Sequence, residues 1–239
     1  MHDPLEQFRV YTLFPIRLGG LDLSFTNASL WMVIATALFL VLASLAMRSK
    51  GVIPNLLQIA TEKCVSFVEE MADNYIGDTR YFFLIFSIFV FIGSCNLIGL
   101  IPYSFTVTSQ IIVTIALALF VFLIATLAGI VKYGFGFMRF FVPRNVPKVM
   151  LPFLSVIEII SYLFRPISLA VRLFANMMAG HIMLKVFSGF SSMLGSFWGV
   201  LPLGLDVILT GFEIFIALLQ AYVFSLLTCI YIKDATHLH

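Results

Sequence analysis

Charge is what this chain has least of. Of its 239 residues, 14 are Lys or Arg and 12 are Asp or Glu, so that 11% are charged and 61% are hydrophobic. A water-soluble domain is usually about 25% charged and about 45–50% apolar. So little polar surface could not cover a soluble globule of this length. The composition therefore predicts an all-α membrane protein, and the net charge of +2 is too small to suggest a nucleic-acid partner.

Other features are scarce or missing as well. The three cysteines, Cys64, Cys95 and Cys229, stand singly, which argues against a disulfide framework or a metal site. Residues 1–27 hold no compact apolar stretch of the kind found in a cleavable secretory signal. No nucleophile motif or nucleotide-binding loop is visible, so we expect no catalytic chemistry and no cofactor in this chain alone. The lack of an internal repeat disfavours an inverted-repeat transporter.

The apolar runs predict how the chain crosses a membrane. A bilayer core of about 30 Å is spanned by about 20 apolar residues in a helix. Residues 29–47 carry no charge and form the first predicted span. Residues 55–75 mix charges with apolar positions at helical spacing, which is typical of an amphipathic helix on a membrane surface. Residues 81–131 carry no charge and exceed one span, so Pro102 is expected to divide them into a helical hairpin.

After an expected loop over residues 132–148, two longer segments follow, at residues 149–187 and 198–232. As helices they would measure about 58 and about 52 Å at about 1.5 Å per residue, well above the apolar thickness. We expect them to tilt steeply, with Pro152 or Pro166 as a possible bend, and to pair as an antiparallel hairpin over residues 149–232. The prediction is one membrane domain of about five membrane helices and one surface helix.

Basic residues indicate the orientation of these spans. Counted over alternating spans, nine lie on one side of the membrane and two on the other. The nine are Arg48, Lys50, Lys63, Arg80, Lys132, Arg139, Arg144, Lys148 and Lys233, and the two are Arg9 and Arg17. This excess predicts that the N-terminus is outside and the C-terminus inside.

Ionisable groups within spans are energetically expensive, which makes them functional candidates. Glu158, Arg165 and Arg172 are spaced by seven and therefore share a stripe of one helix, which Asn176 extends by one turn. A structural ion pair between Glu158 and Arg165 is an equally good interpretation of the first two. Arg172 has no acidic residue within one turn, so its partner is expected on another helix or another chain.

A second set of polar residues faces away from that stripe. His181 lies about half a turn around the helix, and Glu213 and Gln220 are seven apart on the last segment. In an antiparallel hairpin His181 and Glu213 would meet on the outer side of the membrane and could pass protons near neutral pH. A buried hydrogen-bonded pair without a transport role is the alternative. Lys185 and Asp206 lie near the segment ends, where their charged groups would snorkel to the surface.

Three stretches resemble one known family. The stretch SLAVRLFANMMAGH, at residues 168–181, is similar to the signature of subunit a of F-type ATP synthases. The stretch CNLIGLIPYSFTVTS, at residues 95–109, resembles the helical hairpin of that family. The last 23 residues, ALLQAYVFSLLTCIYIKDATHLH, resemble its C-terminal segment in mitochondrial and alphaproteobacterial members.

The resemblance implies a mechanism. Subunit a stands beside a rotating ring of c subunits, each with a membrane carboxylate, and two aqueous half-channels lead protons to and from that ring. Arg172 matches the arginine that separates the half-channels. The positions matching the outer half-channel are Asn176, His181, Glu213 and Gln220, and those matching the inner one are Glu158 and Ser161.

The resemblance also implies partners and a location. The expected partners are the c-ring, the peripheral stalk and other membrane-sector subunits, the lipid bilayer and protons, without nucleic acid or cofactor. The choice of protons over sodium ions comes from the family. The order of His181 and Glu213 and the terminal DATHLH favour the mitochondrial inner membrane, with an alphaproteobacterial plasma membrane as the alternative. A self-contained channel and a purely structural assembly subunit are the competing functions.

Overall fold

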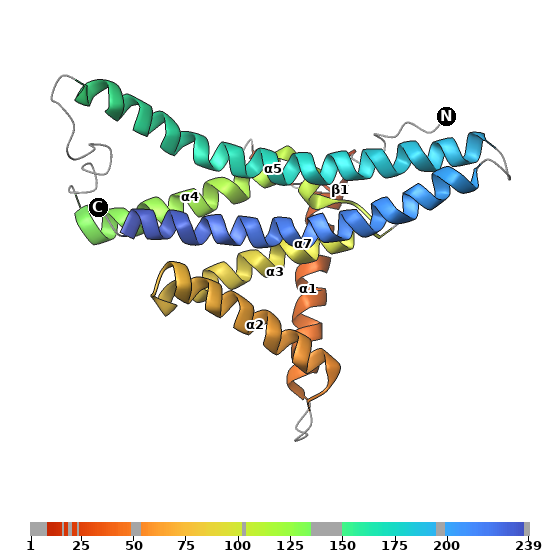
Figure 1. Cartoon of the computed structure of the whole chain (residues 1–239), viewed down its shortest axis with the longest axis horizontal. Coiled ribbons are helices and arrows are strands. Elements are labelled where there is room, and N and C mark those ends of the chain that lie inside the picture. Colours follow the sequence, from red (N-terminus) through yellow and green to blue (C-terminus); the bar gives the residue numbers. More distant parts are fainter. Residues whose placement is uncertain are drawn as a thin grey trace.

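The computed structural model describes residues 9–15, 17–18, 21–22, 24–48, 54–101, 104–134, 150–194 and 199–236. Six long helices dominate these residues (Figure 1). They are α1 (Asn27–Arg48), α2 (Leu56–Tyr75), α3 (Phe82–Gly99), α4 (Ile111–Tyr133), α5 (Leu151–Met193) and α7 (Val200–Thr236). All except α2 are long and apolar enough to cross a membrane. The predicted fold class is therefore confirmed. Pro102 and most of the predicted loop 132–148 lie outside the described residues.

Short strands near the N-terminus were not predicted from the sequence. β1 (Thr12–Phe14) pairs with β4 (Phe25–Thr26), and β2 (Arg17–Leu18) pairs with β3 (Leu21–Asp22), both antiparallel. The side chain of Asn27 ties this segment to the start of α1, because its Oδ1 accepts from the Tyr11 N–H and its Nδ2 donates to the Arg9 carbonyl, both at 3.1 Å. Pairs of two or three residues are too short to leave an alternating pattern in the sequence.

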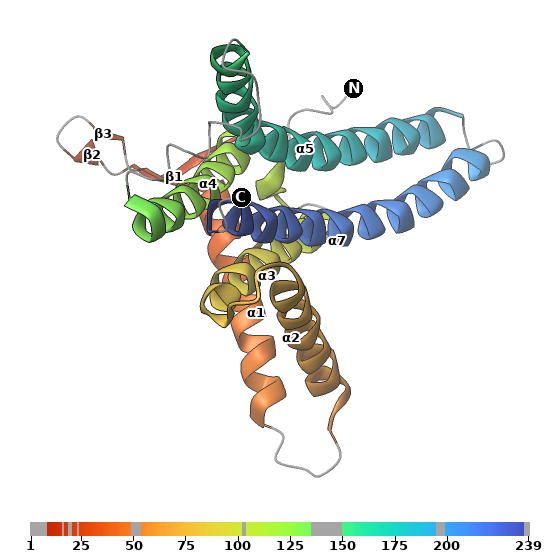
Figure 2. The ribbon, with the colours of Figure 1, turned by 60° about the vertical axis from the view of Figure 1, so that its left-hand side comes forward.

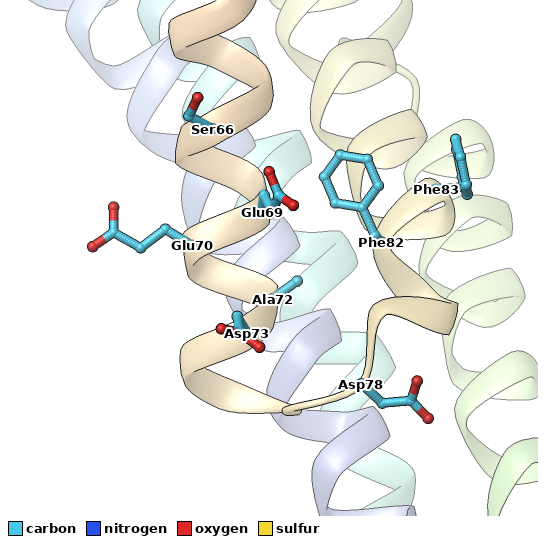
Figure 3. Close-up of a pocket in the computed structure, with 8 residues that line it drawn as sticks. All are labelled: Ser66, Glu69, Glu70, Ala72, Asp73, Asp78, Phe82 and Phe83. Atoms are coloured by element: carbon cyan, nitrogen blue, oxygen red, sulfur yellow. The ribbon is translucent and has the colours of Figure 1, made fainter.

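The amphipathic character of α2 is confirmed. Its buried residues are Val68, Met71 and Ala72, a single stripe at helical spacing, and they pack toward α3. An open cavity of about 660 Å³ lies between α2 and the first turn of α3 (Figure 3). Its acidic lining includes Glu69, which points toward Phe82, and Glu70, which points away from α3. None of the site residues predicted from the sequence lines this cavity.

The long hairpin is also confirmed. α5 and α7 have 43 and 37 residues, which corresponds to about 64 and about 55 Å at about 1.5 Å per residue. They run side by side in Figures 1 and 2 and pack closely. Helices of this length fit an apolar layer of about 30 Å only when they are steeply tilted. Pro166 lies inside α5 and Pro152 in its first turn. The N-terminal turns of α5 diverge from α7 (Figure 2).

Both long helices extend past their predicted ends, to Met193 rather than residue 187 and to Thr236 rather than residue 232. Polar contacts stabilise the additional turns. The Ser191 hydroxyl donates to the Gly199 carbonyl at 2.9 Å, and the Tyr133 hydroxyl of α4 donates to the Thr236 carbonyl at 2.7 Å. Hydropathy alone gives no weight to such contacts, which is why the predicted segments were too short.

The core lies where α3, α4, α5 and α7 meet. Small residues let these helices approach closely, since lipid offers no hydrophobic drive to press them together. A Cβ built on Gly93 of α3 would lie 3.8 Å from the Ala221 Cβ of α7. Ala118 and Ala170 are at most 1% exposed in the same cluster. This packing fixes the position of α7, and with it the polar residues that α7 carries toward α5.

Candidate functional site

Glu158, Arg165 and Arg172 are spaced by seven on α5, but they do not interact with one another as one row of charges. Arg165 turns toward α7, where its Nη1 lies 2.8 Å from the Asp234 carboxylate, and its guanidinium lies 5.5 and 5.6 Å from the ring centres of Tyr162 and Tyr231. Glu158 makes no hydrogen bond or ion pair within the described residues. The interpretation of Glu158 and Arg165 as a structural ion pair is therefore replaced by a pair between α5 and α7.

Arg172 differs from Arg165. Its side chain is exposed on a face of α5 that the rest of the described chain leaves uncovered. It has no hydrogen bond or ion pair with any part of the chain that the structure describes. Ser168, Ala175 and Ala179, which lie three to seven residues away on the same face, are exposed too. Small residues beside a cation leave room for another helix to come close. Farther along this face lies Ser161, which is also exposed.

A partly buried amide pair lies one turn beyond Arg172. Asn176 Nδ2 donates to Gln220 Oε1 at 3.0 Å, joining α5 to α7. Gln220 is only 1% exposed, and its Nε2 has no hydrogen-bond partner among the described residues. A buried amide donor is normally satisfied by protein or by water. The amide pair is therefore one of three polar contacts described here between the two long helices, and along both helices it lies between Arg165–Asp234 and His181–Glu213.

The structure brings His181 and Glu213 together. His181 Nδ1 lies 3.5 Å from Glu213 Oε1, with the two side chains 10% and 5% exposed. The two groups are close but not hydrogen-bonded, and both carboxylate oxygens are buried without a hydrogen-bond partner in the described chain. Gly180 makes the close approach possible, because a Cβ at that position would lie 2.5 Å from Glu213 Oε1.

Two cavities lie on either side of this pair. The larger, about 810 Å³, is lined by His181 and by residues near the N-terminus such as Tyr11 and Asn27. Lys185 and Asp206, which were predicted to snorkel to the surface, line the same cavity as His181. A smaller cavity of about 190 Å³ is lined by Glu213 and by Asn176. These features follow one another in the order large cavity, His181, Glu213, small cavity and amide pair, and we call this series the polar path.

Two polar residues of this region were missed from the sequence. Thr106 lies 2.9 Å from His181 Nε2 through its Oγ1. Asn96 of α3 is fully buried and donates to the Ala217 carbonyl at 3.1 Å, while its Oδ1 has no hydrogen-bond partner among the described residues. Neither residue is ionisable, so neither stands out from the apolar run of residues 81–131 as a charged group would; Asn96 is an uncharged amide within that run.

The arrangement has the chemistry to hold and move protons. Within the described ranges no three His, Cys, Asp or Glu side chains come together as ligands. An imidazole beside a carboxylate can exchange a proton with it at near-neutral pH. A guanidinium keeps its charge at any working pH and cannot relay a proton. The chemistry available is therefore proton transfer along one path that ends near a permanent positive charge.

Comparison with known proteins places the chain in a family. Residues 29–233 match the family model described as ATP synthase A chain. This protein belongs to the ATP synthase A chain family. It is 52% identical to ATP synthase subunit a of Pelagibacter ubique (strain HTCC1062) over 240 residues, covering 99% of this chain and 98% of that one. It is 49% identical to ATP synthase subunit a of Rhizobium rhizogenes (strain K84 / ATCC BAA-868) over 244 residues, again covering 99% and 98%.

A third relative agrees. ATP synthase subunit a of Parvibaculum lavamentivorans is 50% identical over 243 residues, covering 98% of this chain and 94% of the relative. The family match includes both long helices of the hairpin up to residue 233, and therefore Arg172, the amide pair and the His181–Glu213 pair. The candidate site of this A chain family member therefore lies entirely within the residues that match the family model.

Proposed function

We propose that this chain is the proton-translocating stator subunit of the membrane sector of a rotary ATP synthase. Arg172 carries the proposal, because it is a permanent cation on an exposed face of a membrane helix without an ion-pair partner in the described chain. A buried or lipid-facing guanidinium is expensive unless a partner supplies negative charge. A ring of c subunits with membrane carboxylates supplies that charge and is the expected partner.

In the proposed path protons enter through an outer half-channel. Water in the larger cavity reaches His181, which exchanges protons with Glu213, and Asn176 and Gln220 hold the next step toward the ring. Support comes from the 3.5 Å His181–Glu213 contact and the 3.0 Å amide bond. Arg172 favours the ionised ring carboxylate as it passes and blocks a direct proton leak, since its own proton is not released.

The inner half-channel is assigned to Glu158 and Ser161. Ser161 is exposed and Glu158 is partly exposed, and both precede Arg172 on α5. A ring carboxylate would release its proton on this side after it passes the guanidinium. The chain itself performs no catalytic chemistry, so ATP synthesis belongs to partner subunits, and peripheral-stalk subunits hold this chain against the turning ring.

The proposed location is a bacterial plasma membrane, with the N-terminus outside and the C-terminus inside. The three relatives described above are bacterial, which favours this alternative over the mitochondrial inner membrane. The excess of Lys and Arg on one side of the spans supports the orientation.

The Arg172→Lys substitution tests the function. A lysine retains a positive charge but has a compact ammonium that can lose its proton in a poorly hydrated site, whereas a guanidinium cannot. We expect ATP-driven proton pumping by the assembled complex in inverted vesicles to fall to background. The matched control is Arg80→Lys, because Arg80 is also exposed but lies outside the proposed path. Near-normal pumping by the Arg172→Lys complex would disprove the proposed role.

A further inference from the structure

Thr106 occupies a fixed position beside the imidazole of His181. It is 4% exposed and directly precedes the short helix η3 (Val107–Ser109). The Ser109 hydroxyl donates to the Thr106 carbonyl at 2.6 Å. On the other side, a Cβ built on Gly99 would lie 2.8 Å from Thr106 Cγ2, so Thr106 packs directly onto the Gly99 backbone. The hydroxyl therefore has little freedom to move away from His181.

The hydroxyl has two possible hydrogen-bond partners. It can donate to the Gly99 carbonyl at 3.3 Å, in which case its lone pairs accept from a protonated Nε2 of His181. Alternatively it donates to an unprotonated Nε2 across the same 2.9 Å. A hydroxyl is both donor and acceptor and rotates to suit its neighbours. Thr106 thus provides a partner for Nε2 whether or not that nitrogen carries a proton.

The other ring nitrogen faces the carboxylate. With Nε2 on Thr106, Nδ1 of His181 is directed to Glu213 Oε1 at 3.5 Å. A hydronium ion in the larger cavity, which His181 lines, can then give a proton to the unprotonated Nε2 and leave as water, while the proton on Nδ1 passes to the ionised Glu213 carboxylate. The imidazole ends neutral with its proton on Nε2, and Glu213 ends as a neutral acid, so that one proton has moved and no charge is left over.

We propose that Thr106 is the positioning residue for His181. It holds the ring with Nδ1 toward Glu213, and its rotating hydroxyl satisfies Nε2 before and after the transfer. This inference rests on the proposed function of the His181–Glu213 pair. A buried nitrogen that lost its partner in one of the two states would favour the other state and slow the exchange.

The test uses the intact ATP synthase containing this chain, reconstituted into liposomes. Thr106→Val removes the hydroxyl with almost no change of shape, and Thr106→Ser retains it. Thr108→Val is the matched control, because Thr108 is equally buried, at 1% exposed, and its hydroxyl has no hydrogen-bond partner among the described residues. ATP-driven proton pumping is measured between pH 6 and pH 9, together with the amount of this chain in the purified complex.

We expect Thr106→Val to pump about tenfold more slowly than the native complex, as one lost hydrogen bond to a charged state implies. Its pH profile should shift, while Thr106→Ser and Thr108→Val remain within about twofold of native. The charged groups around the His181 imidazole that shape this pH profile are Lys185 on α5, Glu213 and Asp206 on α7, and Arg9 at the larger cavity. They are the same in all three variants.

Native pumping and an unshifted profile in Thr106→Val would overturn the inference, as would a Thr106→Ser complex as slow as Thr106→Val. If valine prevents assembly, Thr106→Ala and Thr106→Ser give the same comparison, because they differ only in the hydroxyl. The Arg172→Lys complex separates this inference from the proposed function. If the Arg172→Lys complex still pumps protons, the proposed function is wrong. If Arg172→Lys does not pump but Thr106→Val pumps at the native rate, only the role of Thr106 is wrong.

Discussion

At the scale of single residues, Gly180 matters for the side chain it lacks. The space that its Cβ would fill holds the carboxylate of Glu213, with Oε1 at 2.5 Å and Cδ at 2.9 Å. Gly180→Ala should therefore displace the carboxylate from His181. We expect the rate of proton pumping by the assembled complex to fall about tenfold, because the carboxylate would lie farther from His181 Nδ1 than its present 3.5 Å. The helix itself should persist, because alanine is the better helix former by about 1 kcal/mol.

Gly189→Ala is the control for that prediction. Gly189 lies on the same helix, and a Cβ built there has no neighbour within 4 Å. Its substitution tests the helix-forming effect of alanine without any contact to the polar path. Pumping at the native rate is expected for Gly189→Ala. Equal slowing in both variants would mean that α5 needs flexibility and that the position of Glu213 is not the cause.

The sequence identifies some site residues far better than others. Arg172, His181 and Glu213 are prominent because ionisable groups are rare in apolar segments. Thr106 has no comparable signal, since hydroxyl residues in membrane helices commonly bond their own backbone. Thr126, for example, donates to the Phe122 carbonyl at 2.7 Å. Only the folded contact between residues 75 positions apart distinguishes Thr106 from such cases.

At the scale of helices, length and apolarity were enough to predict five spans and the long hairpin, because a bilayer fixes how long an apolar helix must be. The pairing between helices was less accessible. Arg165 has an acid, Glu158, seven residues away on its own helix, and nothing in the residue pattern favours a partner on another helix over it. The pair with Asp234 depends on how far α7 extends, and the predicted segment ended before it.

The Arg165–Asp234 pair should hold the C-terminal turns of α7 against α5. The two side chains are 23% and 37% exposed, which places the pair between a buried and a surface ion pair. We expect Asp234→Ala to weaken local stability by about 1–2 kcal/mol. Hydrogen exchange of the backbone amides in the last two turns of α7 should then be about five to thirty times faster.

Lys233→Ala is the matched control, because Lys233 is adjacent but its side chain is exposed. Hydrogen exchange should remain native in that variant. If exchange in α7 is unchanged by Asp234→Ala, the guanidinium is held mainly by the rings of Tyr162 and Tyr231, and the carboxylate is not the fastening element.

At the scale of the whole molecule, the long hairpin exposes large apolar residues on its outer faces. Large residues are exposed on α5, such as Phe164 at 60% and Ile167 at 52%, and on α7, such as Ile208 at 69%. Lipid or another subunit can cover such a surface. Arg172 lies on this surface, whereas His181 and Glu213 are buried behind it. The polar path therefore leads to a face of the protein and does not pass through it.

This geometry predicts that the chain alone does not conduct protons. The purified chain in liposomes, driven by a potassium diffusion potential and followed with a pH-sensitive dye, should give proton flux no higher than empty liposomes. The reason is that the guanidinium of Arg172 cannot relay a proton, and in the proposed mechanism each of the two half-channels ends at a carboxylate that only a partner supplies. Reconstitution with the ring of c subunits should restore flux, and Arg172→Lys in that assembly tests coupling separately. Conduction by the lone chain at the rate of the assembly would instead identify a self-contained channel, and the exposed arginine would then need another explanation.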